Sequence, residues 1–182
     1  DSTKLSEWKG SKRYIVTAYQ SQLTSEPKKG ATVSDLVMGD ILEYKGEKSK
    51  YVMLATPDGR EGYVTKSDVE ELSSWAAQAF DVKKVESTAR RMMGSPYFWG
   101  GTSTKMTDCS GLSKISYFSN GVILMRDAWQ QALTGKKIAA ADWRQARTGD
   151  LLFQLTAAEG MTDAIVAATE RGGAVTFSHV GI

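Results

Sequence analysis

The sequence predicts an α+β chain in which a small β-barrel, residues 1–72, precedes a mixed domain of helices and strands, residues 73–182. Three observations predict this class. Residues 13–72 contain short runs rich in Ile, Val, Tyr and Thr between polar turns. Residues 70–94 lack proline, and lack glycine until Gly94, which favours helices. Strand-like runs then return near the end of the chain.

The first region is predicted to fold from short strands joined by tight turns. In TPDGRE, Pro57 suits the second position of a turn and Gly59 supplies a positive φ, so this segment joins two strands as a hairpin. VMGD is a second turn with glycine, and the charged run KGEKSK is expected to be a solvated hairpin turn. Several short strands at regular spacing are typical of a small barrel. The expected strands cover residues 13–20, 40–44, 51–55 and 61–65.

The second region begins with helices, and the change in composition falls near residues 73–81. One helix is expected to be capped by Asp81 and to end at Gly94. Another is expected over residues 109–118, and TGDLLFQ indicates a turn into a strand. The expected apolar faces are Val82, Val85, Ala89 and Met92 on the first helix, and Leu112, Ile115 and Phe118 on the second.

Composition excludes several classes of protein. The 23 basic and 21 acidic residues give a net charge of +2, which is too mild to suggest nucleic acid binding. One cysteine excludes a disulfide framework, and one cysteine with one histidine leaves only carboxylates for a metal, so no cofactor or metal is expected. No apolar run reaches the length of a membrane span. The sequence does not predict an oligomeric state.

Cys109 and His179 are candidates for nucleophilic catalysis. Cys109 follows the loop GGTSTKMTD and opens a helix-compatible stretch, where unpaired amides and the helix dipole favour a thiolate. AVTFSHVGI is strand-like, and alternation places Val175, Phe177 and His179 on one face, so a strand would hold the imidazole rigidly. The alternative is structural: a lone cysteine is more often a small buried hydrophobe. Composition and periodicity leave both interpretations open.

The segment GSPYFWGGTSTKMTDCSGLSKISYF resembles the signature of the NlpC-type cell-wall cysteine peptidases: an aromatic-Trp-Gly-Gly loop, then Asp-Cys-Ser-Gly and a helix. TGDLLFQ and SHVGI are similar to two further blocks of that family, in the same order. The resemblance covers about residues 82–153 and 175–182. It implies a papain-like fold for residues 73–182.

VTAYQSQL, VSDLVMGDILEYKGE and TPDGREGYVTKSDV resemble the bacterial Src homology 3 module that precedes the catalytic domain in one branch of this family. That branch comprises γ-D-glutamyl-L-diamino acid endopeptidases, which act on peptidoglycan stem peptides. The resemblance implies hydrolysis of the bond between γ-D-Glu and the diamino acid during cell-wall turnover or recycling. It also implies the bacterial cell envelope, periplasmic or secreted, although the chain begins at Asp1 with no signal peptide.

Carried over residue by residue, the resemblance makes Cys109 the nucleophile and His179 its base. Tyr97, Asp108 and Ser110 would lie at the site and hold the free amine of an N-terminal L-Ala. An anion beside the thiol would by itself oppose thiolate formation. The alternative role of Asp108 is therefore that of a helix cap.

MRDAWQQ resembles the Arg-Asp-Ser-x-Gln-Gln block of the same branch. Arg126 would pair with the α-carboxylate of D-Glu, for which its guanidinium fork is well shaped. Asp127 is likewise a candidate substrate-binding residue. Their alternative is a surface salt bridge. Ala128 stands where a serine is frequent. Trp99, with Phe98, is expected in the core or in the wall of the substrate cleft.

Three features depart from the family pattern. The third polar residue of the triad and the later strands of the sheet would follow Ile182, so we interpret the catalytic domain as incomplete at its C-terminus. Residues 154–178 are longer than the usual link and could form a short helix over MTDAIVAATERGG that lines the cleft; a circularly permuted branch carries similar text. Only one Src homology 3 module is visible, which bears on selectivity for a free N-terminus.

Two alternative functions remain at this point. The first is an amidase or D,L-endopeptidase acting on another peptidoglycan linkage. The second is a non-catalytic wall-binding protein in which the small barrel binds the ligand. A reactive thiol at Cys109 would favour an enzyme, and an inert one would favour binding alone.

Overall fold

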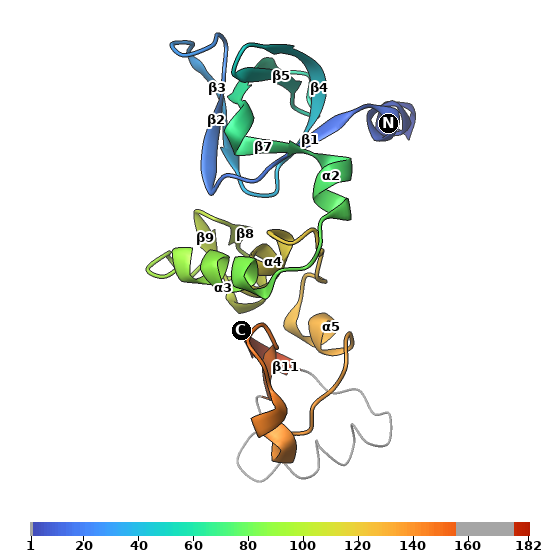
Figure 1. The fold of residues 1–182 in the computed structure, drawn as a ribbon, viewed down its shortest axis with the longest axis vertical. Helices are drawn as coiled ribbons and strands as arrows, with labels where there is room; N and C mark the ends of the chain where they lie inside the picture. Colours follow the sequence, from blue (N-terminus) through green and yellow to red (C-terminus); the bar gives the residue numbers. More distant parts are fainter. Residues whose placement is uncertain (1, 156–176) are drawn as a thin grey trace. The chain divides into compact units, whose positions relative to one another are not determined.

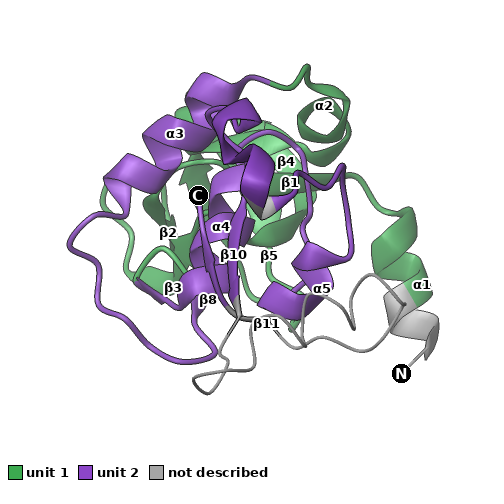
Figure 2. Cartoon of the chain, turned by 90° about the horizontal axis from the view of Figure 1, so that it is seen from below, with its two compact units in different colours: residues 1–80, 103–105 green, residues 81–102, 106–182 purple. Residues whose placement is uncertain are grey.

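The computed structural model describes residues 2–155 and 177–182 of the 182-residue chain. Two compact units divide it (Figure 2). Unit 1 comprises residues 1–80 together with 103–105, and unit 2 comprises residues 81–102 and 106–182. The chain is mixed α/β, as the sequence predicts.

Unit 1 is built on a seven-stranded antiparallel sheet in the described part of the chain, in the order β3-β2-β6-β5-β4-β1-β7. Figure 1 shows this sheet curling round on itself. A helix precedes the sheet, and a 3-10 turn and a short helix flank its last strand. The elements are α1 (Ser2–Gly10), β1 (Arg13–Val16), β2 (Gln20–Thr24), β3 (Thr32–Val37), β4 (Ile41–Lys48), β5 (Tyr51–Ala55), β6 (Glu61–Thr65), η1 (Lys66–Asp68), β7 (Val69–Glu71) and α2 (Leu72–Ala77).

The core of unit 1 is aliphatic and comes from alternate strand positions. Val52 and Leu54 are buried while Met53 between them is half-buried, because successive side chains of a strand point to opposite faces. Each buried side chain of this size contributes roughly 1.5–3 kcal/mol to folding. The cluster consists of Val16, Leu23, Leu36, Leu42, Val52, Leu54, Val64 and Val69.

The predicted β5–β6 hairpin is confirmed. Residues Thr56 and Arg60 close it through a backbone hydrogen bond of 2.9 Å, and Gly59 has a φ of 87°. Two predicted boundaries were wrong. The run RYIVTAYQ divides into β1 and β2, and most of KGEKSK belongs to β4, because a bulge between Tyr44 and Gly46 lets that strand continue.

Unit 2 combines helices with two small antiparallel sheets. In the described residues β8 pairs with β9 and β10 pairs with β11. Helix α4 packs against α3, α5 and β11, and α5 also contacts β11. The elements are α3 (Val82–Arg91), β8 (Thr102–Ser103), β9 (Met106–Thr107), α4 (Cys109–Phe118), α5 (Ala128–Ala132), η2 (Ala140–Gln145), β10 (Leu152–Leu155) and β11 (Phe177–Gly181).

Helix α3 has the predicted cap. The Asp81 carboxylate accepts a hydrogen bond of 2.9 Å from the Lys83 amide, and Val85 and Met92 are buried on the predicted face. The helix ends at Arg91, and Gly94 follows with a φ of 84°.

Helix α4 has the predicted bounds, and its expected apolar face is only partly buried. Ile115 is buried, whereas Leu112 and Phe118 are only half-buried. The remaining buried positions are small. Ser116, for example, donates its hydroxyl to the Leu112 carbonyl at 2.8 Å, so its burial leaves no donor without a partner. These small buried residues are Ser110, Gly111, Ser113 and Ser116.

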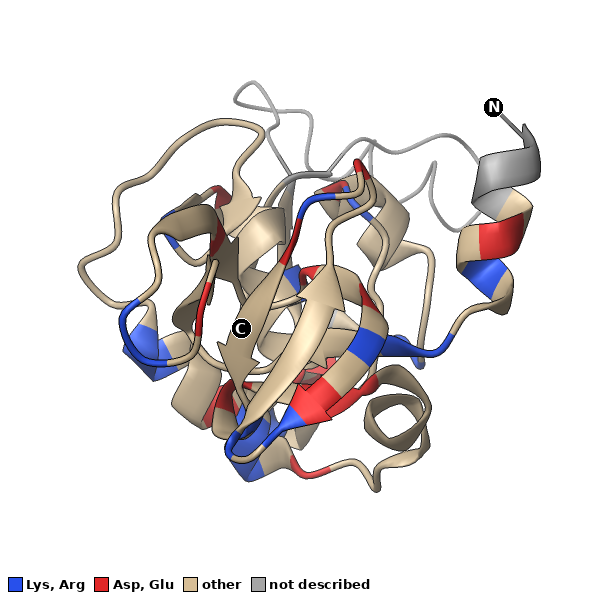
Figure 3. Cartoon of the chain, turned by 90° about the horizontal axis from the view of Figure 1, so that it is seen from above, with Lys and Arg blue, Asp and Glu red and all other residues tan. Residues whose placement is uncertain are grey.

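The helix expected over MTDAIVAATERGG, the expected cleft lining by residues 154–178 and the position of Val175 lie outside the described residues. No helix in the described part of the chain is both long and apolar enough to cross a membrane. Basic and acidic residues are interspersed along the described elements (Figure 3).

Candidate active site

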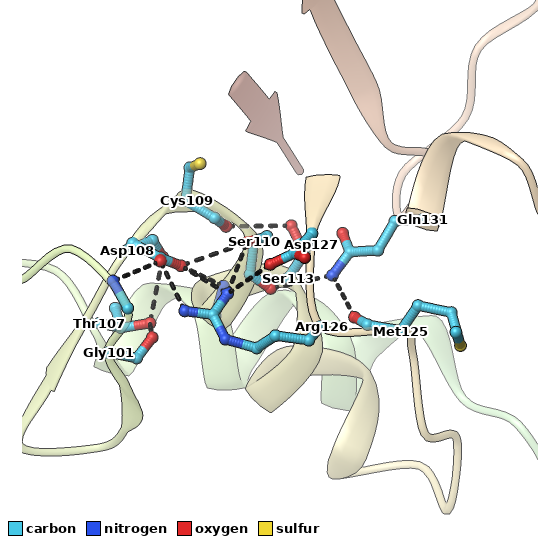
Figure 4. Close-up of polar contacts among 12 residues, drawn as sticks. Gly101, Thr107, Asp108, Cys109, Ser110, Ser113, Met125, Arg126, Asp127 and Gln131 are labelled. Carbon is cyan, nitrogen blue, oxygen red and sulfur yellow. Dashed lines mark hydrogen bonds and ion pairs between the residues drawn. The ribbon is translucent and has the colours of Figure 1, made fainter. Parts of the chain in front are cut away.

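Cys109 is the first residue of α4, and Asp108 caps that helix. The Asp108 Oδ1 atom accepts a hydrogen bond of 2.8 Å from the Gly111 amide in the first turn. Its Oδ2 atom accepts a second, of 2.9 Å, from the Gly100 amide. Cys109 lies at the N-terminus of this helix, and because it is half-buried its thiol is not enclosed in a core. Figure 4 shows the thiol directed away from the polar cluster formed by Asp108 and its neighbours.

The loop before Cys109 lies against the start of α4 with no room for side chains. A Cβ atom at Gly111 would lie 2.1 Å from the Gly101 carbonyl oxygen and 2.5 Å from Thr107 Oγ1. A Cβ atom at Gly101 would lie 2.9 Å from the Phe98 carbonyl oxygen and 2.9 Å from backbone atoms of β9. Gly101 of the Trp-Gly-Gly segment and Gly111 of the Asp-Cys-Ser-Gly segment are therefore required by close approach of neighbouring atoms.

Arg126 joins this cluster from a distant part of the sequence. Its Nη2 atom lies 2.7 Å from Asp108 Oδ2, and its Nη1 atom lies 3.3 Å from Asp108 Oδ1. Nη1 also donates to Ser110 Oγ at 2.9 Å, and that hydroxyl donates to Asp108 Oδ1 at 3.2 Å. The guanidinium therefore binds the carboxylate with both arms and contacts the residue after the cysteine (Figure 4).

The charges in this cluster stabilise one another. Burial alone would raise the pKa of Asp108, but hydrogen bonds from Arg126 and from the Gly111 and Gly100 amides outweigh burial and hold the pKa below its ordinary value. The hydrogen bond to Asp108 raises the pKa of Arg126, against the effect of burial. Both groups are therefore ionised, and the anion beside Cys109 has a cation as its partner.

The half-buried Lys114 and the buried Gln131 hold the segment that leads to Arg126. Lys114 on α4 donates from Nζ to the Leu124 carbonyl at 2.6 Å, and burial followed by the nearby Arg126 lowers the pKa of this lysine. Gln131 on α5 donates from Nε2 to the Met125 carbonyl at 2.9 Å. The sequence did not single out either residue, although Gln131 belongs to the quoted segment MRDAWQQ.

His179 lies on β11, which packs against α4. It is opposite Gln154 of β10 in the strand register, and its side chain is exposed while that of Val180 is buried. Among the described residues no hydrogen bond joins His179 to Cys109. The strand thus brings the imidazole and the thiol to neighbouring elements of unit 2.

The remaining predicted site residues lie at the edges of this cluster. Tyr97 pairs through its backbone with Thr107, next to Asp108, and its side chain is 68% exposed. Trp99 is 75% exposed, which excludes the core and leaves the wall of the substrate cleft, the other place expected for it. Asp127 precedes α5 as its N-cap, its carboxylate lies 4.0 Å from Arg126 Nη1, and its amide donates a hydrogen bond of 3.0 Å to Gln130 Oε1. The described residues contain no group of three or more His, Cys, Asp or Glu side chains that could hold a metal ion.

The site thus combines a half-buried thiol that begins a helix, a charge-balanced carboxylate before it and an imidazole on an adjoining strand, which are groups that nucleophilic catalysis by cysteine uses. Residues 94–171 match the family model described as NlpC/P60. This match covers less than half of the chain and confirms the predicted resemblance to that family.

Curated relatives agree with this assignment. The chain is 34% identical over 113 residues to the γ-D-glutamyl-L-lysine dipeptidyl-peptidase of Bacillus subtilis, covering 62% of this chain and 36% of that protein. It is 41% identical over 71 residues to dipeptidyl-peptidase 6 of Lysinibacillus sphaericus, covering 39% of this chain and 26% of that protein. The chain thus spans about a third or less of the length of these two relatives.

A solved structure has the same fold. The crystal structure of an NlpC/P60 family protein from Bacillus cereus superposes with a TM-score of 0.75 at 21% identity, covering 98% of this chain and 53% of that one.

Proposed function

We propose that the protein is a cysteine peptidase that hydrolyses the bond between γ-D-glutamate and the diamino acid of peptidoglycan stem peptides. The observation that carries this proposal is the position of Cys109 at the start of α4, beside a carboxylate that Arg126 neutralises. The printed names of the relatives from Bacillus subtilis and Bacillus cereus, both γ-D-glutamyl-L-lysine dipeptidyl-peptidases, support the choice of bond.

In this mechanism the Cys109 thiolate attacks the amide carbonyl of the scissile bond. Backbone amides of the first turn of α4 stabilise the oxyanion that forms. The His179 imidazolium donates its proton to the departing amine of the diamino acid, which leaves a thioester between the glutamyl carbonyl and Cys109. Water then hydrolyses the thioester, with His179 as the base, and restores the free thiol.

The substrate would be recognised through its charged groups. Asp108, with Tyr97 and Ser110, would bind the ammonium of a free N-terminal L-Ala, and Arg126 would bind the α-carboxylate of D-Glu. In the absence of substrate these two side chains pair with each other. On binding, the substrate ammonium would take the place of Arg126 beside Asp108, and the substrate carboxylate would take the place of Asp108 beside Arg126. Asp127 and Trp99 would line the same site.

The finer description of the fold belongs to the same proposal. Residues 1–72 would be a bacterial Src homology 3 module, and residues 73–182 would be a papain-like domain. The curled antiparallel sheet of unit 1 and the packing of α4 against β11 support these assignments. The protein would act in the bacterial cell envelope on peptidoglycan stem peptides or murein fragments.

The test is incubation of the protein and its Cys109→Ala variant with L-Ala-γ-D-Glu-diamino acid tripeptide, with products followed by mass spectrometry. We expect release of the diamino acid by the parent protein and none by the variant. The N-acetylated tripeptide is the matched control for amine recognition. Equal cleavage of both peptides would refute amine binding by Asp108, and cleavage of neither would refute the proposed reaction.

A second candidate function is binding of wall material by unit 1. A pocket of about 480 Å³ lies on its sheet, with tyrosines and side chains of both charges in its walls. Retention of the Cys109→Ala variant on insoluble peptidoglycan, lost on substitution of Tyr63 in the pocket, would support it. The lining includes Gln20, Gln22, Lys28, Tyr51, Tyr63 and Asp68.

A further inference from the structure

Gln131 is a polar side chain that is almost completely buried, at 1% exposure. Its Nε2 atom donates two hydrogen bonds, one to the Ser110 carbonyl at 3.0 Å and one to the Met125 carbonyl at 2.9 Å. Burying an amide is unfavourable unless its donors are used, and here both are used on backbone carbonyls. Gln131 therefore links two segments that are far apart in the sequence.

These two segments carry the polar groups of the site. Ser110 follows Cys109, and Met125 precedes Arg126. Arg126 in turn donates to the Ser110 hydroxyl at 2.9 Å, so the contacts form a closed ring from Ser110 through Gln131, Met125 and Arg126 back to Ser110 (Figure 4). The ring holds the guanidinium at one place relative to the first turn of α4.

The other end of Gln131 argues against a role in packing alone. Its Oε1 atom is buried and has no hydrogen-bond partner among the described residues. A buried acceptor without a partner opposes folding, and an apolar side chain of similar size would fill the same space without that penalty. The donor end of the amide is therefore the part that the structure uses.

We propose that Gln131 is a positioning residue for the reaction of Cys109: by fixing the Ser110 and Met125 carbonyls it holds Arg126 against Asp108. This inference rests on the proposed role of Cys109 as the nucleophile. Without Gln131 the Lys114 bond still ties Leu124 to α4, but the Met125 carbonyl next to Arg126 loses its link to the first turn of α4, and the guanidinium moves away. The Asp108 carboxylate, which is 8% exposed, then lies beside the thiol with its negative charge uncompensated.

Reactivity of the thiol reports this change without any peptide substrate. Only the thiolate reacts with iodoacetamide, an adjacent cation favours it, and an adjacent anion opposes it. Several elements around Cys109 carry charged or titratable side chains: Asp108 and Arg126 in the polar cluster, Lys114 and Tyr117 on α4, Asp127 before α5, His179 on β11, and Lys83, Lys84, Glu86, Arg90 and Arg91 on α3. Only the position of Arg126 relative to Asp108 depends directly on Gln131.

The experiment measures the rate of alkylation of Cys109 by iodoacetamide at pH 7 and at pH 10, in the protein and in its Gln131→Met variant. We expect alkylation at pH 7 to be about 3–10-fold slower in the variant, with rates within about twofold at pH 10, where thiols in general are ionised. In an Arg126→Met background the Gln131→Met change should have no further effect. Gln131→Asn, which keeps the amide but cannot reach both carbonyls, gives the same test if Gln131→Met does not fold.

The matched control is Gln130→Met, the same change on the neighbouring residue of α5, which contacts neither carbonyl. It should leave the pH 7 rate unchanged. An unchanged rate in Gln131→Met, an equal loss at both pH values, or an equal effect with and without Arg126 would each overturn the proposal. Because no peptide is cleaved in this assay, its result is independent of whether the proposed hydrolysis occurs.

Discussion

The guanidinium of Arg126 and the carboxylate of Asp108 meet with two nitrogen atoms facing two oxygen atoms, at 2.7 and 3.3 Å. Asp108 also accepts bonds from the amides of Gly100 and Gly111, so one buried carboxylate joins three segments of unit 2. The cap of α4, the glycine loop and the chain before α5 therefore depend on a single side chain. Each of the following predictions concerns that junction or the residues beside it.

Removing the cation should destabilise the protein. Arg126→Met leaves the buried Asp108 carboxylate without its charged partner, and we expect a loss of about 1–3 kcal/mol in the free energy of unfolding, reduced from the deeply buried case because Arg126 is one-third exposed. Urea unfolding of the protein and the variant measures this loss. In an Asp108→Asn background the same change should have much less effect, and additive losses in the two backgrounds would contradict direct coupling.

Stability should fall in acid through Asp108. Its pKa is lower in the folded protein than in the unfolded chain, so the unfolded chain binds the proton more readily. The contribution of Asp108 is thus fully present above the unfolded value of about 3.9 and is lost as the pH falls through the folded pKa. Urea midpoints between pH 2 and 6 check this: Asp108→Asn should flatten the acid limb, and an unchanged slope would contradict it.

A methyl group at Gly111 should disrupt the site. Its Cβ would lie 2.1 Å from the Gly101 carbonyl oxygen, a backbone atom that can shift little, so we expect Gly111→Ala to cost about 3 kcal/mol or more and to abolish hydrolysis. Gly100→Ala is the matched control in the same loop. Its Cβ meets open space but its φ is 84°, so only the strain of about 1–2 kcal/mol should appear. Thermal unfolding compares the two variants.

His179→Ala should separate activity from stability. The side chain is exposed, so the free energy of unfolding should change by no more than about 0.5 kcal/mol. The rate of tripeptide hydrolysis should fall by about 10²–10⁴-fold if the imidazole is the acid and base. Gln154→Ala, at the paired position on β10, is the control and should retain activity within about twofold. Full activity of His179→Ala would exclude this histidine from the reaction.

Local features of unit 2 could be predicted from the sequence because they depend on neighbouring residues. The Asp81 cap, the helix beginning at Cys109 with Asp108 before it and the strand containing His179 all follow from short patterns, and all are present. The apolar face of α4 could not be predicted from periodicity, because serines fill it and bond back to their own helix.

The pairing of Arg126 with Asp108 could not be predicted either. The family resemblance implies that each binds a substrate group of opposite charge, with a helix cap and a salt bridge as the alternatives. Without substrate, the charged partner of each side chain depends on the path of the chain between α4 and α5, and local propensity does not specify that path. Gln131 was missed for the same reason, since its two acceptors are backbone carbonyls from separate segments.

The small buried residues of α4 have a thermodynamic consequence. Opening this helix exposes hydroxyl groups and backbone more than hydrocarbon, whereas opening the sheet of unit 1 exposes valine and leucine side chains. Exposed hydrocarbon raises the heat capacity and exposed polar surface lowers it. The opening free energy of α4, followed by amide hydrogen exchange, should therefore vary almost linearly with temperature, while that of the sheet should curve and weaken on cooling.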